Sequence, residues 1–327
     1  MKNLPYLPRV PLAFLPTPLH PLPHLSKRLG GPALWVKRDD QTGLATGGNK
    51  TRKLEFLLGD AIAQSADTLI TTGAPQSNHA RQTAAAAAHA GLKCTLVLRD
   101  ELPAEVTGNI LLDRLLGADI VWAGKRSTDE AMSEVADELR ARGQRPYVIP
   151  LGGSNAVGAA GYAAAMQELV EQARSLDLHF DAVVFATSSG GTHSGLVVGA
   201  RAAGFAGRVL GVSVDHPAEE CKQAFAPLAN ATAARLGLAA TFTPDDFEVN
   251  DNYLGGGYAV MGQAEREAIQ LAAQSDALLV DPVYTGRALA GLIDLIRTGE
   301  FVPGQNVLFW HTGGSPALFA YARQLVR

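Results

Sequence analysis

Short apolar runs alternate with helix-length stretches through most of this 327-residue chain. We expect strands where Val, Ile, Leu, Thr and Phe cluster, at residues 34–36, 68–72, 94–98, 120–122, 147–149, 182–186, 209–214 and 307–310. Between most of them we expect helices, at 50–64, 78–90, 108–116, 128–142, 158–174, 192–203 and 263–272. Strands that alternate with helices of this length predict βαβ units, mostly parallel sheets and an α/β fold.

The domain organisation follows from the length and from the absence of a linker. At roughly 150 residues per domain the chain suggests two domains, yet no low-complexity run or repeat divides it. Interleaved domains satisfy both observations. We expect a large domain of residues 1–48 and 155–327 and a small inserted α/β domain of residues 49–154, with the chain crossing near Gly152-Gly153.

The composition excludes several classes of protein. With 28 Lys and Arg against 32 Asp and Glu the formal charge is −4, which gives no electrostatic footprint for nucleic acid. No window approaches the roughly 20 apolar residues of a membrane span. Cys94 and Cys221 are isolated, so we expect two reduced thiols, no disulfide and no metal site. The proline-rich N-terminal stretch has no apolar signal region, which predicts a cytoplasmic protein.

A first glycine-rich turn, Gly43 to Thr51, nearly matches the phosphate-binding loop of nucleoside triphosphatases. The motif requires a lysine directly after its second glycine, but here Asn49 follows Gly48. A nucleoside triphosphate site is therefore disfavoured, and an ATP-dependent kinase remains a weak alternative.

A second glycine-rich turn, Ser188-Ser189-Gly190-Gly191-Thr192, follows an apolar strand and precedes an apolar helix. Glycines allow close approach of the backbone, its N–H groups converge, and the helix dipole favours negative charge. A phosphate site is favoured over an ordinary helix cap because small hydroxyl residues are dense here. The dinucleotide-binding pattern G-x-G-x-x-G is absent.

Lys50 is a candidate for covalent attachment of a phosphorylated cofactor. A lysine amine forms a Schiff base with the aldehyde of pyridoxal phosphate, and the second turn would hold the phosphate. Taken alone, Lys50 would be a solvated lysine at the start of a helix. Together the two features favour a covalently bound pyridoxal phosphate cofactor.

Four motifs resemble one enzyme family, that of aminocyclopropane-carboxylate deaminase and D-cysteine desulfhydrase. They are Gly47-Gly48-Asn49-Lys50-Thr51-Arg52-Lys53-Leu54-Glu55, Gln76-Ser77-Asn78-His79-Ala80-Arg81-Gln82, Asp281-Pro282-Val283-Tyr284 and His311-Thr312-Gly313-Gly314. The resemblance runs from about residue 8 to residue 321. It implies a tryptophan-synthase-β-like fold of two open, twisted sheets, pyridoxal phosphate as cofactor, a small-molecule amino acid as substrate and a homodimer.

The resemblance also implies roles for individual residues. Lys50 would carry the cofactor and move the Cα proton, and Asn78 would contact the pyridine hydroxyl. Four residues would bind the phosphate: Ser189, Gly190, Gly191 and Thr192. Thr312 would face the pyridine nitrogen, where a hydroxyl suits elimination better than transamination. Ser77 would bind the substrate carboxylate or assist proton transfer, and the substrate pocket would be completed by Asn78, His79, Tyr258, Tyr284 and Thr285.

Structural interpretations of these residues stay open. Ser77 and Asn78 also read as the cap of an alanine-rich helix, and Thr312 as a hydroxyl bonded to backbone. His79 and His193 are candidate acid–base groups, with a packed, hydrogen-bonded turn favoured for His193.

Arg52 and Lys53 are expected to be surface or interface charges. Tyr258 and Tyr284, taken without the resemblance, would be partly buried core or interface residues.

Three reactions are compatible with the resemblance. The deaminases carry Glu after the pocket tyrosine and Leu in the H-x-G-G motif, where this chain has Thr285 and Thr312. This difference favours β-elimination from a sulfur-containing amino acid, and both D-cysteine desulfhydrases and L-cysteate sulfo-lyases carry threonine in the H-x-G-G motif. The first expectation is D-cysteine, converted to pyruvate, hydrogen sulfide and ammonia. L-Cysteate sulfo-lyase is an alternative, because residues 42–48 and Ala80 resemble those enzymes. Aminocyclopropane-carboxylate deaminase is another, and a non-catalytic protein that binds the cofactor is an alternative of a different class.

Overall fold

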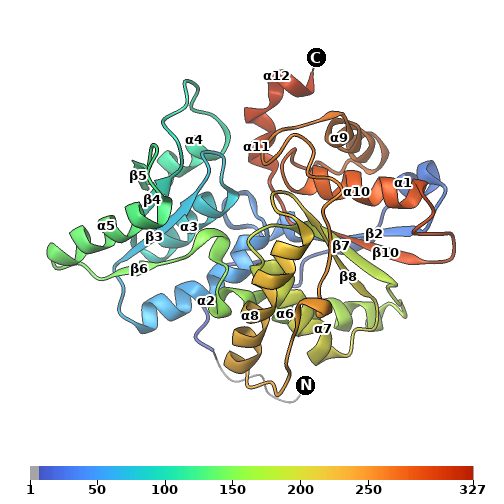
Figure 1. Ribbon diagram of the computed structural model, residues 1–327, viewed down its shortest axis with the longest axis horizontal. Helices are drawn as coiled ribbons and strands as arrows, with labels where there is room; N and C mark the ends of the chain where they lie inside the picture. The colour runs from blue at the N-terminus through green and yellow to red at the C-terminus, as the bar shows by residue number, and fades with distance from the viewer. Residues whose placement is uncertain (1–6, 327) are drawn as a thin grey trace.

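The computed structural model describes residues 7–326 and contains two β-sheets flanked by helices (Figure 1). The larger sheet has six strands in the order β1-β2-β10-β7-β8-β9. These are β1 (Leu19–Pro21), β2 (Ala33–Arg38), β7 (Ala182–Thr187), β8 (Arg208–Ser213), β9 (Glu248–Asn250) and β10 (Asn306–His311). β1 is antiparallel to β2, and the other neighbouring strands are parallel. The predicted α/β class is confirmed.

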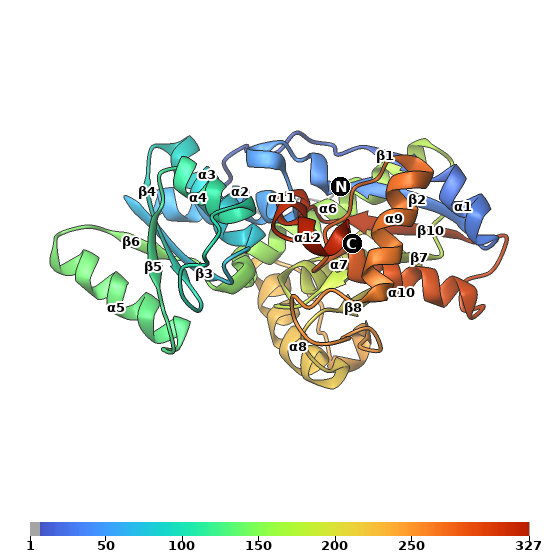
Figure 2. The ribbon, with the colours of Figure 1, turned by 90° about the horizontal axis from the view of Figure 1, so that it is seen from above.

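The smaller sheet has four parallel strands in the order β5-β4-β3-β6. They are β3 (Thr68–Gly73), β4 (Lys93–Leu98), β5 (Asp119–Trp122) and β6 (Pro146–Val148). All four come from one continuous stretch of chain, whereas the six-stranded sheet takes strands from both sides of it. The two sheets lie in separate lobes in both views (Figures 1 and 2).

The chain leaves the smaller sheet through η3 (Leu151–Gly153), where Gly152 and Gly153 have φ of +67° and +62°. Such left-handed conformations favour glycine because a Cβ strains them. The exact domain boundaries, 1–48 with 155–327 and 49–154, stay a prediction.

Twelve α-helices are present between residues 7 and 326. They are α1 (Pro23–Leu29), α2 (Asn49–Ala63), α3 (Asn78–Ala90), α4 (Gly108–Leu115), α5 (Thr128–Ala141), α6 (Ala156–Ser175), α7 (Gly191–Ala203), α8 (Ala218–Arg235), α9 (Gln263–Asp276), α10 (Thr285–Arg297), α11 (Ser315–Ala320) and α12 (Ala322–Leu325). Within the described part of the chain, no helix combines the length and the apolar character that a bilayer crossing needs.

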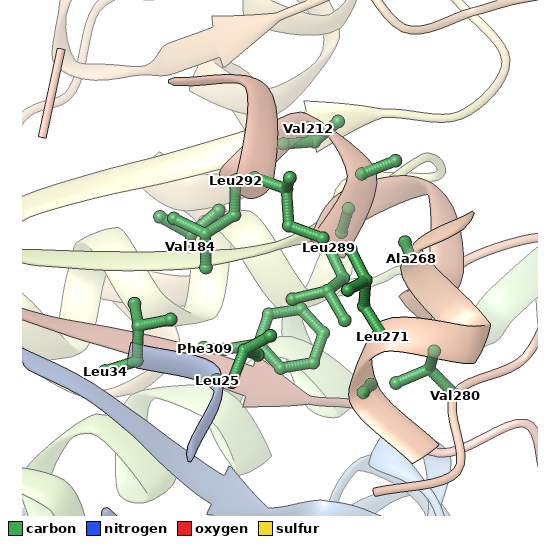
Figure 3. Packing of buried hydrophobic residues seen from close by; sticks show 14 of the residues in the cluster. Leu25, Leu34, Val184, Val212, Ala268, Leu271, Val280, Leu289, Leu292 and Phe309 are labelled. Atoms are coloured by element: carbon green, nitrogen blue, oxygen red, sulfur yellow. The ribbon is translucent and has the colours of Figure 1, made fainter. Parts of the chain in front are cut away.

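Alternate side chains of the central strands enter different cores. Val184 and Phe309 point to the face covered by α1, α9 and α10, where they meet Leu25, Leu289 and Leu292 (Figure 3). Their chain neighbours, Val183, Phe185, Leu308 and Trp310, pack on the opposite face against α6 and α7. Because both faces are covered, these strands are uniformly apolar. Cys94 and Cys221 are buried free thiols.

Arg52, on α2, is buried rather than exposed, so the expectation of a surface or interface charge is wrong. Its side chain donates to Asp39 Oδ2 at 2.8 Å and to Glu168 Oε2, on α6, at 3.0 Å. Burial alone would raise the pKa of Asp39, but the Arg52 guanidinium and Lys37 hold it at about 2. The network fixes α2 against α6, and α2 carries Lys50 at its start.

Candidate active site

A cavity of about 300 Å³ opens between the two sheets, where the carboxyl ends of several strands meet. Open α/β sheets bind ligands at this edge because the loops that follow the strands converge there. Ten of the predicted site residues line the cavity: Lys50, Ser77, Asn78, His79, Ser189, Gly190, Thr192, Tyr258, Tyr284 and Thr312. Gly191 and Thr285 are not among its lining residues.

Lys50 projects into the cavity from the first turn of α2. The helix starts after Gly47 and Gly48, whose φ values are +71° and +131°, and the Asn49 amide donates to the Thr312 carbonyl at 2.9 Å. Burial, aided by the Arg81 guanidinium, lowers the pKa of Lys50 to about 8, against the opposing effect of Asp281. Roughly a tenth of the amine is then unprotonated at pH 7, which makes it a far better nucleophile than a solvated lysine.

The turn before α7 is shaped to receive an anion. Gly190 is left-handed (φ +85°), and a Cβ on Gly191 would lie 2.7 Å from Ser154 Oγ and 2.8 Å from Lys53 Nζ. The Gly191 amide donates to Ser154 Oγ at 3.1 Å, and Ser154 Oγ lies 2.8 Å from Ser189 Oγ. The turn therefore offers hydroxyls and the N-terminus of a 13-residue helix to a bound phosphate.

Lys53 is the main site residue that sequence reasoning missed. The sequence predicts a surface or interface charge here, but the Lys53 side chain is buried, lines the cavity and ends beside Gly191. Nζ donates to the Gly152 carbonyl at 3.0 Å. Burial and the nearby Lys50 hold its pKa well below the ordinary value. The signal was present in the sequence, because residues three apart share one helix face.

Asn78 and Ser77 stand at the N-terminus of α3. Ser77 Oγ accepts from the Ala80 amide at 3.1 Å, so the helix-cap interpretation of Ser77 is confirmed. Asn78 Oδ1 accepts from Arg81 Nη1 at 3.1 Å and from Asn109 Nδ2 at 2.9 Å. This hydrogen-bond pattern assigns the amide oxygen to the protein side and leaves the NH₂ group as donor toward the cavity.

The two histidines singled out by the sequence are both buried. His79 Nε2 lies 2.8 Å from Thr71 Oγ1, and burial with Lys50 and Lys53 holds its pKa well below the ordinary value, so it is neutral at pH 7.

His193 lies on α7 among the rings of Phe185, Phe225 and Phe247, at centroid distances of 4.9, 5.3 and 5.3 Å. Burial lowers its pKa to about 3. The sequence predicts a hydrogen-bonded histidine in a turn, but His193 packs within helix α7.

The segment after β10 brings Thr312 to the cavity. His311 Nδ1 accepts from the Gly313 amide at 3.1 Å, so its other nitrogen, Nε2, donates to the Leu279 carbonyl at 2.9 Å. Gly313 and Gly314 have φ of +95° and +111°, and a Cβ on Gly314 would lie 2.6 Å from Asp281. The two glycines therefore let this segment approach Asp281 closely.

Tyr258 and Tyr284 form a hydroxyl pair. Their phenol oxygens are 2.7 Å apart, and the rings meet edge to face. Burial raises the pKa of Tyr258, and burial with the neighbouring phenol raises that of Tyr284 well above its usual range. Both phenols are therefore protonated at neutral pH.

Thr285 contacts Asp281, the residue that binds the backbone of Tyr284. Its hydroxyl donates to Asp281 Oδ1 at 2.7 Å, while Asp281 Oδ2 accepts from the Tyr284 amide at 3.0 Å. The expected contact of Thr285 with substrate is not supported, because its side chain is fully buried against Asp281. Thr285 instead helps Asp281 to hold the backbone that carries Tyr284.

Two charged residues at the cavity had no sequence motif to reveal them. Arg99 follows β4, and its guanidinium carbon lies 5.3 Å from the centroid of the Tyr258 ring. Asp215 follows β8, and its Oδ2 accepts from Ser188 Oγ at 2.5 Å. They come from different sheets, so only the folded chain brings them to one cavity.

Comparisons with known proteins agree with this geometry. Residues 10–313 match the family described as "Pyridoxal-phosphate dependent enzyme". The chain is 42% identical over 335 residues to a 1-aminocyclopropane-1-carboxylate deaminase of Burkholderia vietnamiensis and 44% identical over 327 residues to a D-cysteine desulfhydrase of Salmonella typhi, with 98% of each chain covered. A solved structure described as an ACC deaminase homologue superposes with a TM-score of 0.90 at 39% identity, covering 98% of this chain and 96% of that one.

Fold and cavity thus define a pyridoxal-phosphate-dependent enzyme with the tryptophan-synthase-β-like fold. More closely, the chain belongs to the family of 1-aminocyclopropane-1-carboxylate deaminase and D-cysteine desulfhydrase. The residues present fit the cofactor, because the turn before α7 tolerates no Cβ at Gly191 and has the Lys53 amine beside it.

Proposed function

We propose that this enzyme eliminates the β-substituent of a small sulfur-containing amino acid, with D-cysteine as the first candidate. One water is consumed, and the products are pyruvate, hydrogen sulfide and ammonia. The proposal rests on family membership for the lyase chemistry and on the cavity for the residues that carry it.

The observation that carries the proposal is the meeting of two kinds of group in one cavity. Lys50 contributes an amine of lowered pKa, which can accept a proton. Tyr258 and Tyr284 contribute neutral phenols, which can donate one. Elimination needs both, because a proton leaves Cα while the departing sulfur gains negative charge.

Pyridoxal phosphate supplies the electron sink that stabilises negative charge at Cα when it is bound. Lys50 would hold the cofactor covalently, and its amine, when free, would take the Cα proton of the substrate. The turn at 189–192 and Lys53 would hold the phosphate, and the Asn78 NH₂ group would donate to the pyridine hydroxyl.

The remaining residues act on the pyridine ring and on the substrate. Thr312 would offer the pyridine nitrogen a neutral hydroxyl. Ser77 and the N-terminus of α3 receive the substrate carboxylate, and the Tyr258–Tyr284 pair protonates the leaving group.

A second candidate substrate is L-cysteate, whose leaving group is sulfite. Arg99 favours it, because a guanidinium at the cavity attracts a sulfonate. Asp215 at the same cavity opposes it, because its carboxylate repels that group. D-Cysteine remains the first candidate, because its neutral thiol is neither strongly attracted by Arg99 nor repelled by Asp215.

Ring opening of 1-aminocyclopropane-1-carboxylate is the third candidate, since relatives of that name are 42–43% identical. Thr285 and Thr312 differ from the residues that the resemblance associates with that reaction.

A substrate panel separates the candidates. D-Cysteine, L-cysteine, L-cysteate and 1-aminocyclopropane-1-carboxylate are each incubated with the cofactor-loaded enzyme. Pyruvate with sulfide from D-cysteine supports the proposal, pyruvate with sulfite supports the second candidate, and 2-oxobutanoate supports the third. A yellow protein that releases none of these products would be a non-catalytic cofactor-binding protein and would contradict the proposal.

We further propose that the enzyme is a homodimer, as the family resemblance implies, and that it is cytoplasmic, because its two cysteines are free thiols, as expected in a reducing compartment. Sedimentation equilibrium of the loaded enzyme tests the subunit number, and a mass of one 34.3 kDa chain would contradict it.

A further inference from the structure

The substrate end of the cavity is the part lined by Tyr258, Tyr284 and Asp215. Arg287, on α10, is buried beside it, with only 1% of its surface exposed. Its guanidinium makes four hydrogen bonds. Nε donates to Glu265 Oε1 at 2.7 Å, and Nη1 donates to the carbonyls of Val214 at 3.0 Å and Gly257 at 3.1 Å. Nη2 donates to the carbonyl of Val260 at 2.8 Å.

Three of these acceptors belong to the chain segments that carry the groups at the substrate end. Gly257 directly precedes Tyr258, and Val260 follows it two residues later. Val214 directly precedes Asp215, and Arg287 itself follows Tyr284 by three residues on the same turn of α10. One side chain therefore links the backbones that present Tyr258, Tyr284 and Asp215.

The segment around Tyr258 depends on such links because residues 251–261 form neither helix nor strand. Its internal backbone hydrogen bonds run from the Gly257 amide to the Leu254 carbonyl at 3.0 Å and from the Val260 amide to the Gly257 carbonyl at 3.3 Å. A further anchor is the Tyr321 hydroxyl, which donates to the Ala259 carbonyl at 2.7 Å. Without Arg287, the Val260 carbonyl loses the guanidinium donor, and the Gly257 carbonyl keeps the 3.3 Å bond from the Val260 amide.

We propose that Arg287 is a positioning residue that sets the Tyr258 hydroxyl against that of Tyr284. A guanidinium is needed because its five N–H groups lie in one rigid fork and reach acceptors in several directions at once. A lysine ammonium donates from a single atom and cannot span the same four acceptors. The inference rests on the proposed role of the tyrosine pair in elimination.

The test is Arg287→Lys, which keeps the buried charge and removes the fork. We expect kcat to fall about 10- to 100-fold, because a misplacement of about 1 Å has that effect. KM should change less than about threefold, and the cofactor spectrum and affinity should stay unchanged. Amide hydrogen exchange, measured by mass spectrometry, should accelerate in residues 254–261 and not in α2 or α7.

The matched control is Arg208→Lys, because Arg208, at the start of β8, is half-buried and also paired to two carboxylates, Glu248 and Glu300, but contacts neither tyrosine segment and does not line the cavity. It should lose stability while kcat per folded molecule and exchange of residues 254–261 hold. If both lysine variants lower kcat alike, Arg287 has a merely structural role and the proposal is overturned.

A double-mutant cycle with Tyr258→Phe tests whether Arg287 acts through Tyr258. The double variant should be no slower than Tyr258→Phe alone, and independent, multiplying losses would overturn the proposal. Should Arg287→Lys not fold, Glu265→Gln replaces it; it weakens the Nε contact and should give a smaller loss of the same kind. A chain inactive on every substrate of the panel contradicts the proposed function, whereas the exchange measurement still decides the role of Arg287.

Discussion

The phenol oxygen of Tyr258 lies 2.7 Å from that of Tyr284, although 26 residues separate them in the chain. Tyr284 is held by Asp281 at the start of α10, and Tyr258 by the irregular segment that Arg287 and Tyr321 anchor. Each phenol is the hydrogen-bond partner of the other. A substitution of one tyrosine therefore also changes how readily the other donates its proton.

Tyr284→Phe should slow elimination about 100-fold or more, because it removes one hydroxyl of the proton-donating pair. The cofactor should remain bound, since the Tyr284 hydroxyl pairs with Tyr258 and not with the phosphate turn. Steady-state rates and the visible spectrum of the same preparation check both statements. Loss of the cofactor in this variant would contradict the assignment of Tyr284 to the substrate.

Lys50→Ala should lose the covalent link to the cofactor, and turnover should fall by at least about 1000-fold, since both attachment and proton transfer use this amine. The readout is borohydride reduction followed by peptide mapping: the wild type should carry the label on residue 50. A label on Lys53 instead would show that the two lysines have been assigned the wrong way round.

Lys53→Met should weaken cofactor binding roughly 10- to 100-fold, the effect of losing one charged hydrogen bond to the phosphate. At saturating cofactor the variant should regain most of its turnover, unlike Lys50→Ala. Titration of the apoenzyme with pyridoxal phosphate, followed by absorbance, gives the dissociation constant. An unchanged constant would place the phosphate elsewhere.

The rate at which the apoenzyme takes up pyridoxal phosphate should rise with pH and level off above about 8. Burial and Arg81 lower the pKa of Lys50 to about 8, and the unprotonated amine is the form that attacks the aldehyde. Below that pH each unit should cost about tenfold in rate. Stopped-flow absorbance between pH 6 and 9.5 measures this, and a rate still rising tenfold per unit at pH 9.5 would contradict the lowered pKa.

Arg52→Met should destabilise the fold by about 3–5 kcal/mol, because it removes the guanidinium that pairs with the buried carboxylate of Asp39. Urea unfolding measures the change. Arg140→Met is the control: Arg140 pairs with Asp137 at the surface, and its loss should cost less than about 1 kcal/mol. Equal losses of unfolding free energy in the two variants would mean that burial of the Arg52 network does not increase its contribution to stability.

Much of the fold was predictable because its signals are local. The expected strands at 68–72, 182–186 and 307–310 correspond to β3, β7 and β10, since their apolar runs suit strands covered on both faces. Helices α8 and α10 and the short strand β9 were not predicted. α8 contains Pro227 and has no clear apolar stripe, and β9 has three residues, too few for a periodic pattern.

Within the site, the sequence alone determined the elements that local backbone geometry requires: a lysine after two glycines, and a glycine turn before an apolar helix. The tertiary structure decided which charges are buried and which side chains meet. Arg52 and Lys53 look like surface residues in the sequence, because only the packing of α2 between two lobes removes them from water. Tyr258, Arg99 and Asp215 come together for a similar reason, since contacts between distant segments depend on the closing of the whole chain and leave no periodic trace in any one segment.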